Sequence, residues 1–314
     1  MKATIIAALL VQFFISPLLS QEKKPEDNYK RLEEKYQKLK DSSSELHPLI
    51  PAVSAIVLHC DQIEVNLFTS LISATRYRNE SGNLMDLGMR QSYFYSTIQL
   101  TYGLSKSGRF NAGVDLNSII GRLDQDKNSS ILKVFNSQVE GGSRYTKAIT
   151  SFSPRIRWRP LKRNYNFTIQ NSLIVPVPAN TQQESVLGKG QYYFSTQLLY
   201  NQPLTKQLFL FSQIGLNYGI KNGNLPATFY SPVAIYFSYL IPRRIIIFTL
   251  CNYLPVFSTQ NGQHYYRSTF QAGGGVQYQL SKLLTINGYY ANDIAGKNYS
   301  DFNTYSISLR FTTR

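Results

Sequence analysis

Three arginines at alternating positions of one segment could hold or steer an anion. Arg155, Arg157 and Arg159 alternate with Ile156 and Trp158. Successive side chains of a β-strand point to opposite faces, so the three guanidinium groups would share one face. This spacing predicts either a charged constriction that binds anions or a network of interior ion pairs that fills and stiffens the fold. Both interpretations stay open from the residues alone.

Two acidic residues fall on polar strand faces and could meet these arginines. Glu64 and Asp115 alternate with apolar neighbours in the segments 62–77 and 109–121. An arginine that faced lipid at the middle of a bilayer would cost about 2–4 kcal/mol, so an inward orientation is favoured for all three arginines. We therefore expect Arg155, Arg157, Arg159, Glu64 and Asp115 to line a polar interior.

Apolar and polar residues alternate along the segments that carry these residues. Near the end of the chain, Tyr305, Ile307, Leu309 and Phe311 alternate with polar residues, which is the pattern of a two-faced strand. The same pattern recurs along the chain, and many segments exceed the usual length of globular strands. We expect strands at 62–77, 90–104, 109–121, 147–159, 165–177, 190–201, 207–220, 229–240, 244–257, 266–280, 283–294 and 303–313.

The connections between these strands alternate in length. Short ones are expected at 105–108, 160–164, 202–206, 241–243 and 281–282, and long ones at 79–89, 122–146, 178–189, 221–228, 258–265 and 295–302. Short turns on one side and long loops on the other are typical of outer-membrane barrels. The fold class predicted is all-β, an antiparallel up-and-down transmembrane β-barrel of about twelve strands. An even strand count places both ends on the periplasmic side.

The first 60 residues differ from the rest. Residues 1–20 have a positive start at Lys2, an apolar core and a small residue at Ser20, which predicts a signal peptide for export to a bacterial outer membrane. Residues 21–60 form a charged periplasmic leader, a short helix followed by a proline-rich lead-in. The helix could contact a periplasmic partner or be a frayed, solvated leader. The barrel is expected to span residues 61–314.

Composition narrows the class of partner. Lys and Arg number 33 against 18 acidic residues, a net charge of +15, yet only 16% of residues are charged. A soluble domain carries about 25%. Nucleic acid is not expected, since no basic helix appears and the chain is exported. The expected partners are outer-membrane lipids, lipopolysaccharide and a small solute of unknown identity, and the barrel is expected to be a monomer or a small oligomer.

The two cysteines, Cys60 and Cys251, could form a disulfide bond with each other or stay free.

Few residues could support catalysis. The histidines are His47, His59 and His264, and only His264 has a serine nearby, Ser268. A serine hydrolase needs a base within hydrogen-bond reach and a third group that orients it, and that pattern is missing from the sequence. Cysteine and histidine never cluster with metal-ligand spacing. We expect no cofactor, no metal and no catalytic residue.

The first strands resemble a known group of proteins. The segments Asp61–Leu71, Arg90–Ser105 and Arg109–Leu116 resemble uncharacterised outer-membrane β-barrels of Bacteroidota-type bacteria. They are also similar to putative transporters of the phenol-degradation (MetA-pathway) group. The resemblance covers roughly the first hairpin and its neighbour. It implies a passive porin-like or transporter-like barrel and supplies no functional residues.

The sequence thus favours a channel or transporter for small polar or anionic solutes. One alternative is a closed structural or adhesion barrel whose outer loops, chiefly 122–146, bind a partner. Another is a surface enzyme that modifies lipids through His264. The glycine run Gly273–Gly275 could either relieve crowding inside the barrel or bend its wall, and the bend is the favoured interpretation.

Overall fold

The computed structural model describes residues 57–139, 141, 143–161, 165–178, 180, 183, 190–221, 226–241, 244–258 and 267–313. The expected signal peptide and leader helix lie outside these residues, as does His264. The chain divides into the units Met1–His47 and Pro48–Arg314, and every described residue belongs to the second. No helix in this described part is both long and apolar enough to cross a membrane.

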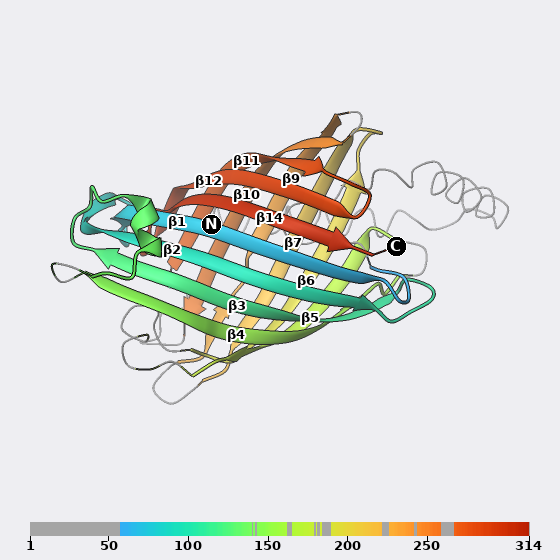
Figure 1. Ribbon diagram of the computed structural model, residues 1–314, viewed down its shortest axis with the longest axis horizontal. Coiled ribbons are helices and arrows are strands. Elements are labelled where there is room, and N and C mark those ends of the chain that lie inside the picture. Colours follow the sequence, from blue (N-terminus) through green and yellow to red (C-terminus); the bar gives the residue numbers. More distant parts are fainter. Residues whose placement is uncertain are drawn as a thin grey trace. The chain divides into compact units, whose positions relative to one another are not determined.

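This unit is built almost entirely of antiparallel strands (Figure 1). The strands are β1 (Ile63–Arg78), β2 (Leu84–Gly103), β3 (Phe110–Asp124), β4 (Arg144–Trp158), β5 (Phe167–Pro176), β6 (Tyr193–Pro203), β7 (Leu208–Gly219), β8 (Thr228–Tyr230), β9 (Val233–Ile241), β10 (Ile245–Ser258), β11 (Arg267–Gln279), β12 (Leu284–Lys297), β13 (Tyr299–Ser300) and β14 (Asn303–Thr312).

The sheet closes on itself because the first and last long strands pair. β1 pairs with β2 on one side and with β14 on the other, with Glu64 opposite Thr312. β8 and β9 both pair with β7 and β10, so together they fill one place in the wall. β13 and β14 likewise share one place beside β1. The barrel therefore has twelve strand positions, which confirms the number expected from the sequence.

A proline separates β8 from β9. Pro232 lies between them, and its carbonyl accepts a hydrogen bond from the Gly215 backbone N–H at 2.7 Å. A Cβ atom on Gly215 would come within 2.7 Å of Pro232 Cγ, so the close approach needs glycine at this point of β7. Proline lacks an N–H to give to the ladder, which explains why the strand breaks here while its two halves keep the same neighbours.

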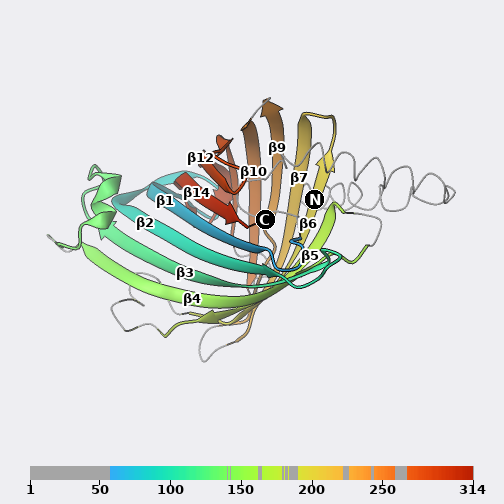
Figure 2. The same cartoon turned by 45° about the vertical axis from the view of Figure 1, so that its right-hand side comes forward.

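The barrel is apolar outside and polar inside, the reverse of a soluble domain. Side chains such as Ile98, Ile156, Val276 and Ile307 on the outer face are about half exposed. The inward positions are buried and mostly polar: Glu64, Asn66, Thr101, Asn111, Ser153, Arg155, Arg157, Thr168, Gln170, Ser172, Ser195, Asn217, Ser238, Gln277, Thr285, Asn287, Ser306, Ser308 and Arg310. Figure 2 shows the strands that carry these positions, β1 to β4 among them, as one curved wall.

The connections define two ends of the barrel. We call one end the turn end: it carries the beginning of β1 and the tight turns that follow β2, β4, β6, β9 and β11. We call the other the loop end, because it carries the remaining, longer connections. The expected loop 295–302 is wrong: β12 runs to Lys297, and Tyr299–Ser300 pairs with Tyr77 and Arg78. The expected loop 79–89 is also too long, since β2 begins at Leu84. Both differ because β1 and its partners extend past the rest of the wall.

The loop 125–143 folds against the outer face of the wall at the loop end and contains a short 3-10 helix, η1 (Ile131–Phe135). Arg122 Nε lies 2.8 Å from Asp124 Oδ1, and Arg122 also donates to the carbonyls of Asn136 and Gln138. The Phe135 ring packs edge-on against Phe94, with centroids 5.0 Å apart. This turn of helix was not expected from the sequence.

Residues 57–60, just before β1, pack against the barrel wall. Val57 and Leu58 are buried, and the His59 carbonyl lies so close to Gly103 that a Cβ there would be 1.7 Å from the His59 oxygen. Gly103 falls on the inward face of β2, two residues after Thr101. The segment 57–60 therefore lies against the inner wall at the turn end.

The glycine run of β11 makes room for side chains inside the barrel. A Cβ on Gly273 would be 2.6 Å from Ala291 Cβ, and one on Gly275 would be 2.6 Å from Phe248 Cζ. Crowding, the interpretation that the sequence did not favour, thus accounts for these glycines. No bend of the wall is needed to explain them.

Candidate functional site: the barrel interior

A buried arginine of β4 is the centre of the polar side of the interior. Arg155 Nε lies 3.0 Å from Asp115 Oδ1, an ion pair whose angles are not those of a hydrogen bond. Arg155 also donates to Thr101 Oγ1 at 2.5 Å and to Gln170 Oε1 at 3.3 Å. Alternation along β2, β3, β4 and β5 brings these four side chains to one inner surface. Arg155 and Asp115, both expected to face the interior, lie side by side there.

Arg157 lies on the same inner surface. Arg159 makes its contacts with other residues, at the turn end. Arg157 donates to Gln170 Oε1 from Nε at 3.0 Å and from Nη2 at 2.7 Å, and it is only 4% exposed. Arg159 follows the end of β4 at the turn end. There it donates to the Ser107 carbonyl at 3.2 Å and stacks over the Tyr165 ring at 4.2 Å. The three arginines therefore do not form one row, because β4 ends at Trp158.

The closing strands add a second ion pair that extends this polar surface. Arg310 Nε on β14 donates to Asn66 Oδ1 at 3.0 Å and lies 3.7 Å from Glu64 Oε2 on β1. Asn66 in turn donates to Glu64 Oε1 at 2.9 Å. Glu64 takes the inward position expected for it. Arg310 was missed as a candidate, although its place on the polar face of the last strand was a usable signal.

These five ionisable side chains form what we call the arginine band. Its members are Glu64, Asp115, Arg155, Arg157 and Arg310. Three guanidinium groups and two carboxylates leave one positive charge, and all five are largely removed from water. Buried charges require partners because desolvation costs several kcal/mol per ion. The band is therefore an interior ion-pair network that carries an excess of one positive charge.

The opposite side of the interior is an aromatic wall. Phe211 on β7, Tyr236 on β9 and Phe248 on β10 form a row, with ring centroids 5.8 Å apart for the first pair and 6.3 Å for the second. Leu199, Leu250 and Ala291 are buried against them. These side chains, with Tyr289, are called the aromatic wall below. Aromatic pairs at this spacing add about 0.5–1.5 kcal/mol beyond burial of their area.

Tyr289 connects the aromatic wall to the closing strands. Its ring lies 6.4 Å from that of Phe248, and it lies opposite Ser306 of β14, whose hydroxyl accepts a hydrogen bond from Ser70 of β1. Phe211 and Phe248 are 1% and 2% exposed. Because the arginine band is also nearly inaccessible, the space left between the two sides is narrow.

The aromatic wall was not predicted. The signal for it was present in the segment 244–257, which is apolar on both faces and therefore could not be given a phase. The inward position of Phe211 also departs from the polar neighbours Gln213 and Asn217 on its face. Large apolar residues on an inward face thus indicate where a barrel interior is filled.

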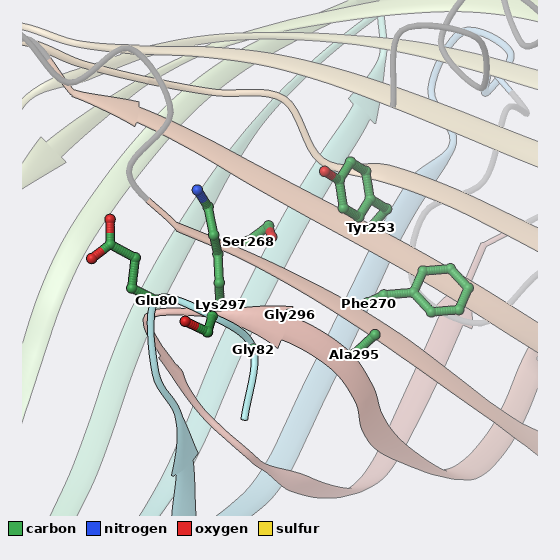
Figure 3. A pocket seen from close by; sticks show the side chains of 9 residues that line it. Glu80, Gly82, Tyr253, Ser268, Phe270, Ala295, Gly296 and Lys297 are labelled. Carbon is green, nitrogen blue, oxygen red and sulfur yellow. The ribbon is translucent and has the colours of Figure 1, made fainter. Parts of the chain in front are cut away.

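A separate groove of about 320 Å³ lies at the loop end (Figure 3). Tyr253 and Phe270, which pair across β10 and β11, lie at one end of it, and Glu80 and Lys297 lie at the other. The neighbouring Gln271 points inward, since its amide bonds to inward side chains. Phe270 therefore points outward, and the groove belongs to the outer face and not to the lumen.

The thiols and aromatic belts fit this arrangement. Cys60 and Cys251 are free thiols, and Cys251 lies exposed on the outer face. Tyr192, Tyr218 and Tyr239 are exposed near strand ends. At the turn end, the rings of Phe110 and Trp158 stack with centroids 6.5 Å apart.

The comparisons with known proteins address the fold. No family model and no curated protein matches the sequence. The fold is similar to an outer membrane channel from Pseudomonas putida F1, with a TM-score of 0.67 and 10% identity over 84% of this chain and 100% of that one. It is also similar to the beta domain of the Bordetella autotransporter BrkA, with a TM-score of 0.52 and 11% identity over 79% of this chain and 99% of that one.

Fold and interior together define the class of protein. A closed antiparallel barrel of twelve strand positions, apolar outside and polar inside, has the construction of transmembrane β-barrels. Such a barrel satisfies all backbone polar groups internally, which a span across lipid requires.

Proposed function

We propose that this protein is an outer-membrane channel that carries small polar or anionic solutes passively. The observation that carries the proposal is the closed wall with exposed apolar side chains outside and a charged, polar interior. The similarity of its fold to an outer membrane channel supports it. In this proposal the export signal directs the chain to the outer membrane, and the turn end faces the periplasm.

The preference for anions follows from the arginine band. Its excess of one positive charge lies in a narrow, poorly solvated passage, where a fixed charge acts more strongly than in bulk water. Arg157 is the member of choice for a test, because it donates to the neutral Gln170 from Nε and Nη2. Its replacement changes the charge of the passage and leaves in place the ion pairs of Arg155 with Asp115 and of Arg310 with Glu64.

Selectivity in planar lipid bilayers tests this proposal. In a potassium chloride gradient, Arg157→Gln should shift the reversal potential toward cation preference, because one cation of the band is gone. Arg244→Gln is the matched control, since Arg244 is exposed at the turn end and outside the band. An unchanged reversal potential in Arg157→Gln would contradict the assignment of the band as the selective element.

A closed structural or adhesion barrel is the second candidate, and the filled interior favours it. Phe211 and Phe248 occupy the passage from one side and the arginine band from the other. Current separates the two candidates: the channel proposal expects discrete conductance steps, and Phe248→Ala should enlarge them. The control is Ile247→Ala, on the outer face of the same strand. A barrel that carries no current at any voltage, with or without Phe248, would favour the structural role.

A further inference from the structure

An arginine at the loop end of the interior lacks a partner for its charge. Arg267 begins β11, pairs with Val256 and lies on the inward face that Thr269 and Gln271 continue. Its Nε is buried and makes no hydrogen bond. Its guanidinium carbon lies 5.3 Å from the centre of the Tyr299 ring. Among the described residues, no carboxylate or carbonyl oxygen accepts a hydrogen bond from this guanidinium group.

Two carboxylates at the loop end, Asp293 and Asp301, have other partners. Asp301 forms ion pairs with Arg76 at 2.9 Å and Arg78 at 3.2 Å. Asp293 accepts hydrogen bonds from the Phe302 backbone N–H at 2.9 Å and from the Gln271 amide at 3.4 Å. Neither of them forms an ion pair with Arg267, and the ion pairs of Asp301 are with Arg76 and Arg78. A guanidinium that is partly buried without an anion is unusual, because its desolvation is not offset.

A chain of aromatic rings extends from the Tyr299 ring beside Arg267. Tyr299 packs edge-on against Phe302 at 5.6 Å, Phe302 against Tyr93 at 6.2 Å, and Tyr93 lies 6.2 Å from Tyr95. On the other side, Tyr230 and Arg267 both lie opposite Val256 of β10, so the two side chains share the inward face.

Tyr230 in turn packs edge-on against Tyr193 with centroids 5.5 Å apart. These rings come from β2, β6, β8 and the segment β13–β14, and Tyr299 and Tyr230 are the two that lie beside Arg267.

These rings also supply hydrogen-bond donors. The hydroxyls of Tyr93, Tyr95, Tyr230 and Tyr299 make no hydrogen bond to another described residue. Tyr95, on the inward face of β2, is 43% exposed, so solvent in the lumen reaches it. Phenol hydroxyls and a guanidinium group are donors that match a carboxylate, and ring faces match a flat apolar body.

We propose that Arg267 and the neighbouring tyrosines form a binding site for small aromatic carboxylates at the loop end of the lumen. The guanidinium group holds the carboxylate, and the rings of Tyr230 and Tyr299 contact the aromatic body. The site rests on the proposed channel function and names its solute class. A solute that enters from the loop end meets this site before it reaches the aromatic wall and the arginine band.

Calorimetric titration of the refolded barrel in detergent with benzoate tests the site without requiring transport. The wild type should bind benzoate more tightly than acetate, which lacks the ring, and more tightly than benzyl alcohol, which lacks the charge. Arg267→Gln should weaken benzoate binding about tenfold or more, since a charge-assisted hydrogen bond is lost. Arg267→Lys should retain part of the affinity, because lysine keeps the charge without the bidentate geometry.

Controls separate this inference from the channel proposal. Arg244→Gln removes the same charge at the turn end and should leave benzoate affinity unchanged, and heat-modifiable migration on gels confirms that each variant is folded. Benzoate affinity that is the same in Arg267→Gln and wild type would overturn the site, as would acetate binding as tight as that of benzoate. A barrel that binds benzoate through Arg267 but carries no current would overturn the channel and keep the site.

Discussion

Gly275 on β11 lies directly opposite Phe248 on β10, and a Cβ atom on Gly275 would come within 2.6 Å of Cζ of the phenylalanine ring. The same atom would also meet the Gly288 carbonyl oxygen at 2.3 Å. The ring that narrows the interior therefore depends on a missing side chain on the neighbouring strand. Neither residue can be exchanged for a larger one without moving the other.

Gly275→Ala should destabilise the barrel by about 1–3 kcal/mol, the usual cost of overpacking a filled interior. Urea unfolding in detergent or lipid, followed by the fluorescence of Trp158, the single tryptophan of the chain, measures this loss. Gly288→Ala is the matched control, since a Cβ there meets only the Ser306 carbonyl, at an ordinary 3.6 Å. Equal stability of the two variants would contradict the crowding described for Gly275.

The ion pair of Arg155 and Asp115 should behave as a unit. Arg155→Gln leaves the inward Asp115 carboxylate without its cation, and breaking a buried pair typically costs about 3–5 kcal/mol. Asp115→Asn in the same chain removes the stranded charge and should recover much of that loss. The free energies of unfolding of the two single variants and the double variant give the coupling. Additive losses would show that the two side chains do not stabilise each other.

Much of the wall could be predicted from the sequence because its cause is local. Each strand has one face toward the apolar outside and one toward the polar interior. Apolar and polar residues therefore alternate along it, whichever strands lie beside it. The inward positions of Arg155, Arg157, Glu64 and Asp115 follow from the same alternation. The limits of strands are less local: Tyr299 and Ser300 extend the sheet only because β1 lies beside them to accept the pairing.

The missed features depend on contacts between distant parts of the chain. Arg310 joins the arginine band because β14 closes the barrel against β1 and thereby meets Glu64. Phe211, Tyr236 and Phe248 come from three strands, and nothing in one strand shows that the others will offer rings at the same place. Closure and packing across the interior decide these contacts, and alternation along a strand does not contain that information.

The contact of His59 with Gly103 predicts that Gly103→Ala will displace the segment 57–60 from the inner wall. A Cβ there would meet backbone atoms, which cannot rotate away. Leu58→Cys, in a chain with Cys60→Ser and Cys251→Ser, supplies a probe at a buried position. A water-soluble maleimide should modify this probe slowly when Gly103 is present and many times faster with Gly103→Ala.

Gly288→Ala in the same probe chain controls for a general loosening of the barrel, since a Cβ there is tolerated. Labelling at the same slow rate in the Gly103→Ala and Gly288→Ala chains would show that the segment does not depend on Gly103.

Asp61, just before β1, should make stability depend on pH at the turn end. The hydrogen bond from the Tyr102 hydroxyl, 2.6 Å from Asp61 Oδ1, lowers the pKa of this carboxyl below its ordinary 3.8, and Cys60 contributes in the same direction. A carboxyl whose pKa is lower in the folded state stabilises that state above its unfolded pKa. The contribution is lost as the pH falls through the folded pKa, which lies below 3.8.

Asp61→Asn isolates this effect, because asparagine also accepts a hydrogen bond and tolerates the left-handed backbone found here, with φ of 66°. The other carboxyl groups titrate alike in the wild type and in Asp61→Asn. The difference between the urea unfolding midpoints of the two proteins therefore measures the contribution of Asp61 to stability. The wild type should be the more stable at neutral pH, and the difference should shrink on acidification to about pH 3. A difference that stays constant over this range would mean that Tyr102 does not hold the ionised form of Asp61.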